Sequence, residues 1–443
     1  MDAKSFDNPF RRDAISWLPD EVLGKILSFL PTKQAVSTSL LSTRWRYIFR
    51  LVDNLEFDDS FSLLAQEAQQ PRNANREAFE KFLRAQGVDE QTSYVFTEGF
   101  KNMVDRTLAL QCDYPIKKFS IKCHVGKDDD DSRKACVGRW ISNVVGRGVS
   151  ELDLRIKDGT EHFLPPLLFA SKTLVKLTIG TQLYLGKLPS YVSLPSLKVL
   201  FIDSVFFEYE DLCCVFLAGC PVLEELLVHH KDFTGMPETI SSPTVKRLSV
   251  YYDSPIDVYD DTSMSFDLPN LVYLEYSDCA LAEYMQVNLD SLVEAKLDLY
   301  EAGNVKRRDV TNLVTGIRNV EILHLSPASV DVIYSYCRDG LPVFNNLVNL
   351  SFGCKNQRGW NLLADLLEQS PKLETLIIQD LTGYTRDVSM PLNQVKVLRV
   401  LNYGGTDEEL KRLKNFLGGK CNAEVVDEGI RLQTNRILEF QFQ

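Results

Sequence analysis

One apolar pattern recurs along most of the 443-residue chain and constrains its fold more than any other feature. The pattern is apolar-x-x-apolar-x-apolar. It starts twelve times, at Ile116, Val149, Leu174, Leu197, Leu223, Val245, Leu271, Leu292, Val320, Leu347, Leu373 and Val395. The gaps between starts run from 21 to 33 residues and average about 25. Units this short carry an apolar edge that they cannot bury alone, so neighbouring units must stack around a shared core.

This spacing falls mostly within the range of roughly 20–29 residues that is typical of leucine-rich repeats. It predicts an α/β solenoid with a parallel β-sheet on its concave face and helical or irregular segments on its convex side. Residues 211–218 and 360–368 favour helices, whereas residues 284–289 look irregular. The alternative is an α/β sandwich in which the periodicity is coincidental.

The first 50 residues contain more large apolar side chains than a small helical unit can hide. Val22, Ile26 and Leu30 form one helical stripe, and Leu23 with Leu27 forms a second. Pro31 ends this helix, and Thr32 and Ser42 are suited to cap two further short helices. Three such helices enclose little volume, so the surplus apolar face predicts a docking surface for a partner.

This segment resembles the F-box. The matching positions, in order, are Leu18, Pro19, Glu21, Leu23, Ile26, Leu30, Val36, Ser39, Leu40, Ser42, Arg44 and Trp45. The resemblance implies docking to a Skp-type adaptor, which joins a cullin scaffold in a modular ubiquitin ligase. The residues expected to contact the adaptor are Leu18, Pro19, Glu21, Leu23, Ile26, Leu27, Leu30, Val36, Leu40 and Trp45. The alternative is a helical hairpin that only caps the domain behind it.

The C-terminal part resembles a second module of the same kind of protein. From Leu347 onward, Trp360, Leu363 and the turn at residues 370–374 resemble the FBD module of plant F-box/leucine-rich-repeat proteins. We therefore expect four regions: an F-box (13–55), a linker with a capping helix (56–115), leucine-rich repeats (116–346) and an FBD-like segment that continues the solenoid (347–443).

Two stretches lie outside the repeats. Phe100, Val104, Leu108 and Leu110 predict a helix that caps the first strand of the sheet. The run Asp128–Asp131 lacks the ligand spacing of a calcium loop, so a solvated loop is expected there.

Composition and motifs argue against several classes of function. A net charge of −12 argues against nucleic-acid binding, and no apolar run is long enough to span a membrane. Residues 2–13 lack the apolar core of a signal peptide, and the ten cysteines form no CxxC pair, so we expect reduced thiols and a cytoplasmic and/or nuclear protein. No metal-ligand spacing, phosphate loop or nucleophile motif is found. We expect no metal, no cofactor and no enzyme activity.

The third, fifth and seventh residues of each repeat should point to the concave face. Over all twelve units these positions hold seven acidic and seven basic residues, which argues against a polyanion groove. Aromatic and arginine residues are the types that dominate binding hot spots. The candidate substrate-binding residues are Phe201, Leu227, His229, Arg247, Tyr251 and Tyr273. The alternative is that these side chains merely cover the sheet.

Together these features predict the substrate-recognition subunit of an SCF-type ubiquitin ligase, with the repeats binding a target protein. Two alternatives remain open: a non-degradative protein that holds the adaptor without a cullin, and a receptor for a small molecule.

Overall fold

The computed structural model describes most of the chain. The described residues are 14–59, 92–125, 131–157, 164–186, 188–189, 191–207, 212–230, 238–252, 263–301, 307–379, 381, 384, 390–392, 394–417, 424–426 and 438–441. The chain divides into two compact units. The first comprises Met1–Leu185 and Ser193–Leu197, and the second Gly186–Val192 and Lys198–Gln443.

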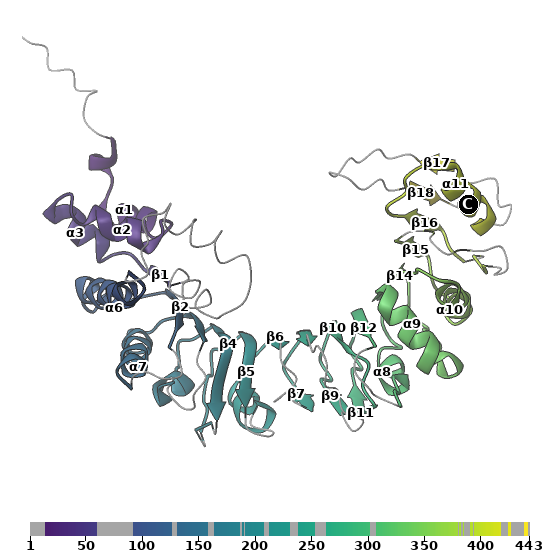
Figure 1. Ribbon diagram of the computed structural model, residues 1–443, viewed down its shortest axis with the longest axis horizontal. Coiled ribbons are helices and arrows are strands. Elements are labelled where there is room, and N and C mark those ends of the chain that lie inside the picture. Colours follow the sequence, from purple (N-terminus) through teal and green to yellow (C-terminus); the bar gives the residue numbers. More distant parts are fainter. Residues whose placement is uncertain are drawn as a thin grey trace, which may run out of the picture. The chain divides into compact units, whose positions relative to one another are not determined.

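The first unit combines a small helical cluster with a parallel sheet. Its elements are η2 (Ala14–Trp17), α1 (Asp20–Leu27), α2 (Thr32–Thr38), α3 (Thr43–Phe49), β1 (Asn54–Asp58), α6 (Thr92–Gln111), β2 (Lys118–His124), α7 (Asp131–Gly146), β3 (Glu151–Lys157), η3 (Pro166–Ala170) and β4 (Lys176–Gly186). The strands follow the order β1-β2-β3-β4, and every pair is parallel. Helices α6 and α7 lie on one side of this sheet (Figure 1).

The second unit continues the same construction. Its main-sheet strands are β5 (Val199–Phe207), β6 (Glu225–His230), β8 (Arg247–Tyr252), β10 (Tyr273–Cys279), β12 (Glu294–Tyr300), β13 (Ile322–Leu325), β14 (Asn349–Phe352), β15 (Thr375–Ile378), β16 (Val397–Val400), β18 (Leu438–Gln441) and β17 (Glu424–Val426), in that spatial order. The pairs from β5 to β16 are parallel, and β18 lies antiparallel to both β16 and β17. Its helices are η4 (Leu212–Phe216), η5 (Leu217–Gly219), α8 (Thr311–Gly316), α9 (Pro327–Tyr336), η6 (Arg338–Gly340), α10 (Gln357–Glu368) and α11 (Asp407–Phe416).

The predicted repeat pattern matches the strands throughout. Each of the twelve starts is followed two residues later by the first residue of a strand, from Ile116 before β2 to Val395 before β16. All twelve starting residues are buried. The alternating burial of β6 and β12 places one apolar set in the core and leaves the other set on the opposite face. The predicted α/β leucine-rich-repeat fold is confirmed.

The layer that covers the core is partly a second sheet, which the sequence analysis did not predict. Strands β7 (Thr239–Ser241), β9 (Ser263–Asp267) and β11 (Glu283–Asn288) form a parallel three-stranded sheet. The prediction that residues 284–289 are irregular was wrong. The rings of Phe266 and Tyr284 each pack edge-on against Tyr276 of β10, with centroids 5.3 and 6.2 Å away. Stacking, rather than local pattern, makes this segment a strand.

The stretch between the helical cluster and the first repeat also differs from the expectation. Strand β1 crosses the predicted boundary between residues 55 and 56 and pairs with β2. The predicted helix exists as α6, with Phe100, Val104 and Leu108 buried, but it connects two parallel strands and does not cap an edge strand. Asp131 begins helix α7 instead of ending a solvated loop, while Asp128–Asp130 lie outside the described residues.

The free edge of β1 is covered by the N-terminal helices. The backbone N–H of Glu56 donates to Thr32 Oγ1 at 2.7 Å, and the N–H of Asp53 donates to Ser28 Oγ at 3.2 Å. Asn54 Nδ2 donates to the carbonyl of Ser28 at 3.1 Å. The sequence suggested that Thr32 caps α2. The Thr32 hydroxyl instead accepts a hydrogen bond from the edge of the sheet. Covering an edge strand in this way prevents it from pairing with another chain.

Candidate functional site

The N-terminal helices expose an apolar surface. Nine large apolar or aromatic side chains there are more than a third exposed: Ile15, Trp17, Val22, Ile26, Phe29, Leu30, Leu40, Leu41 and Tyr47. We call these nine residues the F-box surface. Leu40 is 83% exposed. A leucine this exposed, within a cluster of other apolar side chains, is typical of a surface that a partner covers.

One apolar stripe of α1 is exposed and the other is buried. Val22, Ile26 and Leu30 belong to the F-box surface, whereas Leu23 and Leu27 are buried against α3 and its neighbours. Leu23 and Leu27 are therefore corrected from partner contacts to core residues. Gly24 lies between the stripes, where an added Cβ would meet Leu51 Cβ at 2.6 Å, so α1 needs a glycine to approach this closely.

The other predicted adaptor contacts are at least partly exposed to solvent. Pro19, Glu21 and Leu40 are exposed, and Leu18, Val36 and Trp45 are half-buried. Trp17, Phe29 and Leu41 belong to the F-box surface but were not among the predicted contacts. In the sequence, only their large apolar side chains next to the helical stripes mark these three residues as candidate contacts.

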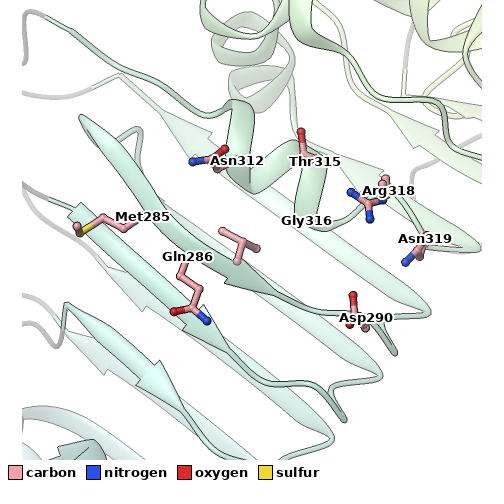
Figure 2. A pocket seen from close by; sticks show the side chains of 9 residues that line it. Met285, Gln286, Asp290, Asn312, Thr315, Gly316, Arg318 and Asn319 are labelled. Atoms are coloured by element: carbon pink, nitrogen blue, oxygen red, sulfur yellow. The ribbon is translucent and has the colours of Figure 1, made fainter.

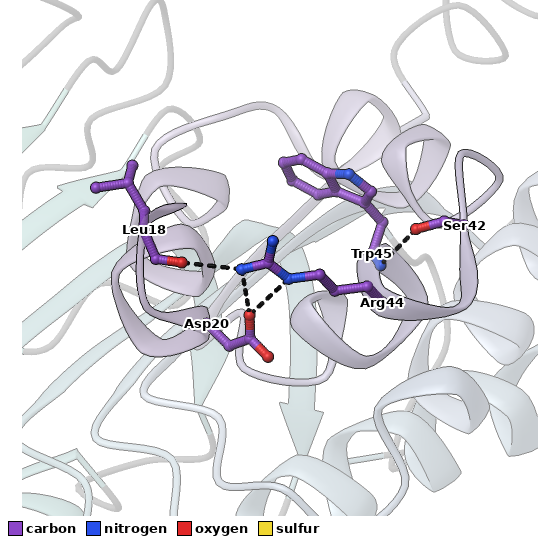
Figure 3. Close-up of polar contacts among 5 residues, drawn as sticks. All are labelled: Leu18, Asp20, Ser42, Arg44 and Trp45. Atoms are coloured by element: carbon purple, nitrogen blue, oxygen red, sulfur yellow. Dashed lines mark hydrogen bonds and ion pairs between the residues drawn. The ribbon is translucent and has the colours of Figure 1, made fainter. Parts of the chain in front are cut away.

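A polar clamp joins the start of α1 to α3 (Figure 3). Arg44 donates from Nε and Nη2 to Asp20 Oδ1 at 3.0 and 2.9 Å, and from Nη2 to the carbonyl of Leu18 at 2.9 Å. Ser42 caps α3 as predicted, since its Oγ accepts the N–H of Trp45 at 3.3 Å. The clamp fixes the orientation of the helices that carry the F-box surface.

The second candidate surface is the main-sheet face that points away from the helices and the second sheet. We use the name central sheet face for the outward residues of five strands, β5, β6, β8, β10 and β12, all in the second unit. Register aligns them in three rows: Val199, Glu225, Arg247, Tyr273 and Glu294; Phe201, Leu227, Ser249, Glu275 and Lys296; and Asp203, His229, Tyr251, Ser277 and Asp298.

Five of the six predicted substrate-binding residues are accessible on this face. Arg247 is exposed, Tyr251 is 36% exposed, and Phe201, Leu227 and His229 are half-buried. Tyr273 is only 8% exposed and is corrected to a supporting residue. The Arg247 guanidinium lies 4.1 Å from the centre of its ring and Lys296 Nζ lies 5.2 Å from it, while its hydroxyl donates to Glu275 at 2.9 Å.

The polar residues of this face also interact with one another. His229 Nδ1 lies 2.9 Å from Asp203 Oδ1, across the β5–β6 pair. Burial and the hydrogen-bonded Glu275 carboxylate raise the pKa of Tyr251 to about 12, so its hydroxyl stays protonated. Burial lowers the pKa of His324, which neighbours this face on β13. Nothing in this arrangement resembles a nucleophile held beside a base.

A shallow pocket of about 330 Å³ lies on the opposite side, between β11 and α8 (Figure 2). Gln286, Asp290, Arg318 and Asn319 supply its polar side chains, and Met285 and Val287 its apolar ones. It is separated by the thickness of the sheet from the residues predicted to bind a substrate.

The described part of the chain contains neither a membrane-spanning helix nor a metal-binding cluster. None of the helices there is long and apolar enough to cross a bilayer. Within those same residues no three His, Cys, Asp or Glu side chains gather in a way that could hold a metal ion.

Comparison with known proteins gives matches to both parts of the chain. The sequence model of the F-box domain matches residues 15–57. The model described as "FBD-associated F-box protein At5g56370, LRR repeats" matches residues 137–290. Together with the fold and the F-box surface, these matches define the class: a leucine-rich-repeat protein that begins with an F-box.

Relatives from Arabidopsis thaliana extend the match over nearly the whole chain. The F-box/LRR-repeat protein At3g60040 is 69% identical over 419 residues, which cover 94% of this chain and 90% of the relative. The F-box/LRR-repeat protein At1g06630 is 63% identical over 430 residues, covering 96% of this chain and 99% of the relative. The chain belongs to the plant F-box/FBD/LRR-repeat family.

Proposed function

We propose that this chain is the substrate-recognition subunit of an SCF-type ubiquitin ligase. In this role the F-box surface docks a Skp-type adaptor and, through it, a cullin scaffold, while the repeats bind a target protein. The observation that carries the proposal is the F-box surface itself: nine large exposed apolar residues on a family-matched F-box. A patch of this kind is costly to leave in water and is typical of a protein interface.

The proposed role needs no reaction chemistry from this chain. A receptor of this kind accelerates transfer by holding the target beside an enzyme that carries the reactive thioester, which is an effect of proximity. The proposed setting is the cytoplasm and/or the nucleus.

The first test is adaptor binding by a variant of the F-box surface. Ile26 is 46% exposed on α1, and Leu410 is 41% exposed on α11. Ile26→Asp places a charge in the proposed interface, so adaptor recovery in a pull-down should fall at least tenfold because a buried unpaired carboxylate is costly. Leu410→Asp, a matched change on another helix, should leave recovery unchanged. Equal recovery with both variants would contradict the proposal.

A second measurement separates a ligase receptor from a non-degradative binder. Affinity purification of the full chain should recover a cullin together with the adaptor, and captured target proteins should increase when the proteasome is inhibited. Recovery of the adaptor without any cullin would instead favour the non-degradative alternative.

A further inference from the structure

The central sheet face is uncovered within the described part of the chain. Parallel sheets usually have both faces covered, because both faces carry side chains that pack. Here helices and the second sheet cover one face, while Phe201, Leu227 and Tyr251 remain partly exposed on the other. An open face of this size that mixes apolar and charged side chains is suited to a binding partner.

The charge of this face is strongly biased, although the sequence-wide count is balanced. Five of its fifteen residues are carboxylates, and two are cationic: Asp203, Glu225, Glu275, Glu294 and Asp298 against Arg247 and Lys296. Stacking places these five carboxylates, which come from four strands, on one face. Neighbouring strands of that face lie roughly 5 Å apart.

The two cations do not neutralise this excess. Both lie against the Tyr273 ring, and Lys296 also lies 3.7 Å from Glu294. Among the described residues, no hydrogen bond or ion pair joins the half-buried Glu225 side chain to another group. The nearest polar contact of Asp298 is a 3.5 Å hydrogen bond from Ser277. These two carboxylates, on β6 and β12, therefore form no ion pair among the described residues, although Arg247 is the register partner of Glu225.

The sheet face of the first unit provides the contrast. Among its outward residues whose side chains the structure describes, four are carboxylates and four are cations: Glu56, Asp58, Glu151 and Asp153 against Lys118, Lys122, Arg155 and Lys176. Two ion pairs form among them, with Lys122 Nζ 3.8 Å from Asp58 and Arg155 Nε 3.2 Å from Asp153. These eight side chains together carry no net charge.

We propose that the central sheet face binds a lysine- or arginine-bearing segment of the target protein. The cationic groups of that segment meet Glu225, Glu275 and Asp298, and their aliphatic stems cover Phe201, Leu227 and Tyr251. Such complementarity speeds association and rejects acidic competitors. The inference rests on the proposed function only in assuming that the repeats meet a target.

The probe is a library of random dodecapeptides displayed on phage and selected against the immobilised full chain. Three proteins are compared: the wild type, the variant Glu225→Gln with Asp298→Asn, and the control Glu56→Gln with Asp58→Asn. The control removes the same charge with the same residue types from the face of the first unit. Thermal unfolding of all three checks that they fold. If the double variant unfolds, Glu225→Gln is compared with Glu56→Gln instead.

The wild type and the control should enrich peptides of positive net charge. The most enriched basic peptide, measured by fluorescence anisotropy, should bind the Glu225/Asp298 variant about tenfold more weakly, since each lost exposed ion pair costs about threefold. Enrichment without a positive bias would overturn the inference. An equal loss in the control would also overturn it, because the attraction would then reflect the total charge of the chain.

Adaptor binding is measured on the same preparations. A protein that fails to bind the adaptor but captures basic peptides contradicts the ligase role and supports this inference. A protein that binds the adaptor but shows no preference for basic peptides contradicts this inference alone.

Discussion

The F-box surface and the central sheet face are built in opposite ways. The F-box surface comes from one continuous segment of about 35 residues, and its exposed side chains are apolar or aromatic. The central sheet face takes its residues from five strands spread over about 100 positions, and a third of them are carboxylates. An apolar surface gains free energy by leaving water, whereas a charged face mainly selects its partner and guides the encounter. The F-box surface is thus suited to tight apolar binding, and the central sheet face to the selection of a partner.

The largest expected effect separates these two surfaces directly. Leu40→Asp combined with Leu41→Asp should weaken adaptor binding about a thousandfold or more, since two carboxylates would be forced into an apolar interface. Capture of basic peptides should be unchanged, because the central sheet face lies in the other unit. Titration calorimetry with the purified adaptor gives the first quantity and anisotropy the second. Parallel loss of both activities would mean that the surfaces are not independent.

The second prediction concerns the pH dependence of stability. A buried carboxyl lies beneath the central sheet face, whereas the described part of the F-box has none. Asp278 of β10 is fully buried; Tyr276 donates to it at 2.7 Å and the N–H of Cys279 at 2.6 Å. Burial raises the pKa of Asp278 to about 7, although these hydrogen bonds oppose the shift. Among the described residues of the F-box, the buried polar side chains are hydroxyl groups: Ser28, Thr32 and Ser39.

The sign of the pH effect follows from this raised pKa. The folded chain holds the Asp278 proton more tightly than the unfolded chain, so its contribution to stability is complete below about pH 4. It is lost as the pH rises to about 7, by up to about 4 kcal/mol. Urea unfolding at pH 5 and pH 8 should show this loss, and Asp278→Asn should remove it. The exposed change Asp298→Asn should leave the pH dependence as in the wild type.

A third prediction compares the two stripes of α1. Leu23→Ala should lower the free energy of unfolding by about 3 kcal/mol, since it leaves a cavity in the small F-box core. Val22→Ala, one residue away and exposed, should change it by less than about 0.5 kcal/mol but weaken adaptor binding. Chemical denaturation and a pull-down measure the two effects. If Val22→Ala is the more destabilising change, the assignment of the stripes is reversed.

The smallest effect tests the same distinction on the central sheet face. Tyr273→Ala should cost about 2 kcal/mol of stability, because Arg247 and Lys296 lose the ring they lie against and Glu275 loses a hydroxyl donor. Tyr251→Ala should cost less than about 1 kcal/mol, since Tyr251 is 36% exposed. Thermal melts of both variants provide the comparison, and equal destabilisation would contradict a supporting role for Tyr273. Tests of target binding should therefore retain Tyr273.

Much of the fold follows from patterns that lie within single segments. All twelve repeat starts precede a strand, because an apolar residue at a fixed offset must enter the core wherever units stack. Helix α10 and the Ser42 cap also follow from local spacing. Strand β11 could not be predicted in this way, since only its pairing with β9 makes it a strand. The FBD-like boundary at residue 347 stays a prediction.

For the candidate sites, too, some features follow from the sequence and others depend on the folded structure. The sequence placed Leu23 and Ile26 on two stripes of one helix but could not say which stripe faces a partner. That choice depends on where α3 lies, because the stripe that meets it becomes core. Likewise, an aromatic residue at Tyr273 could be recognised as facing outward, but its burial between two cations depends on the neighbouring strands.

Apolar spacing and the F-box pattern are properties of the amino-acid chain, and they suffice to predict a stacked repeat protein with an F-box. Which charges lie close to one another depends on the folded protein. Seven acidic and seven basic residues cancel when counted over all twelve repeats, yet five of the carboxylates lie on the central sheet face. In the first unit, stacking brings Lys122 of β2 to 3.8 Å from Asp58 of β1. Charges interact through space, so their effect depends on the distances that the stacked strands set between them.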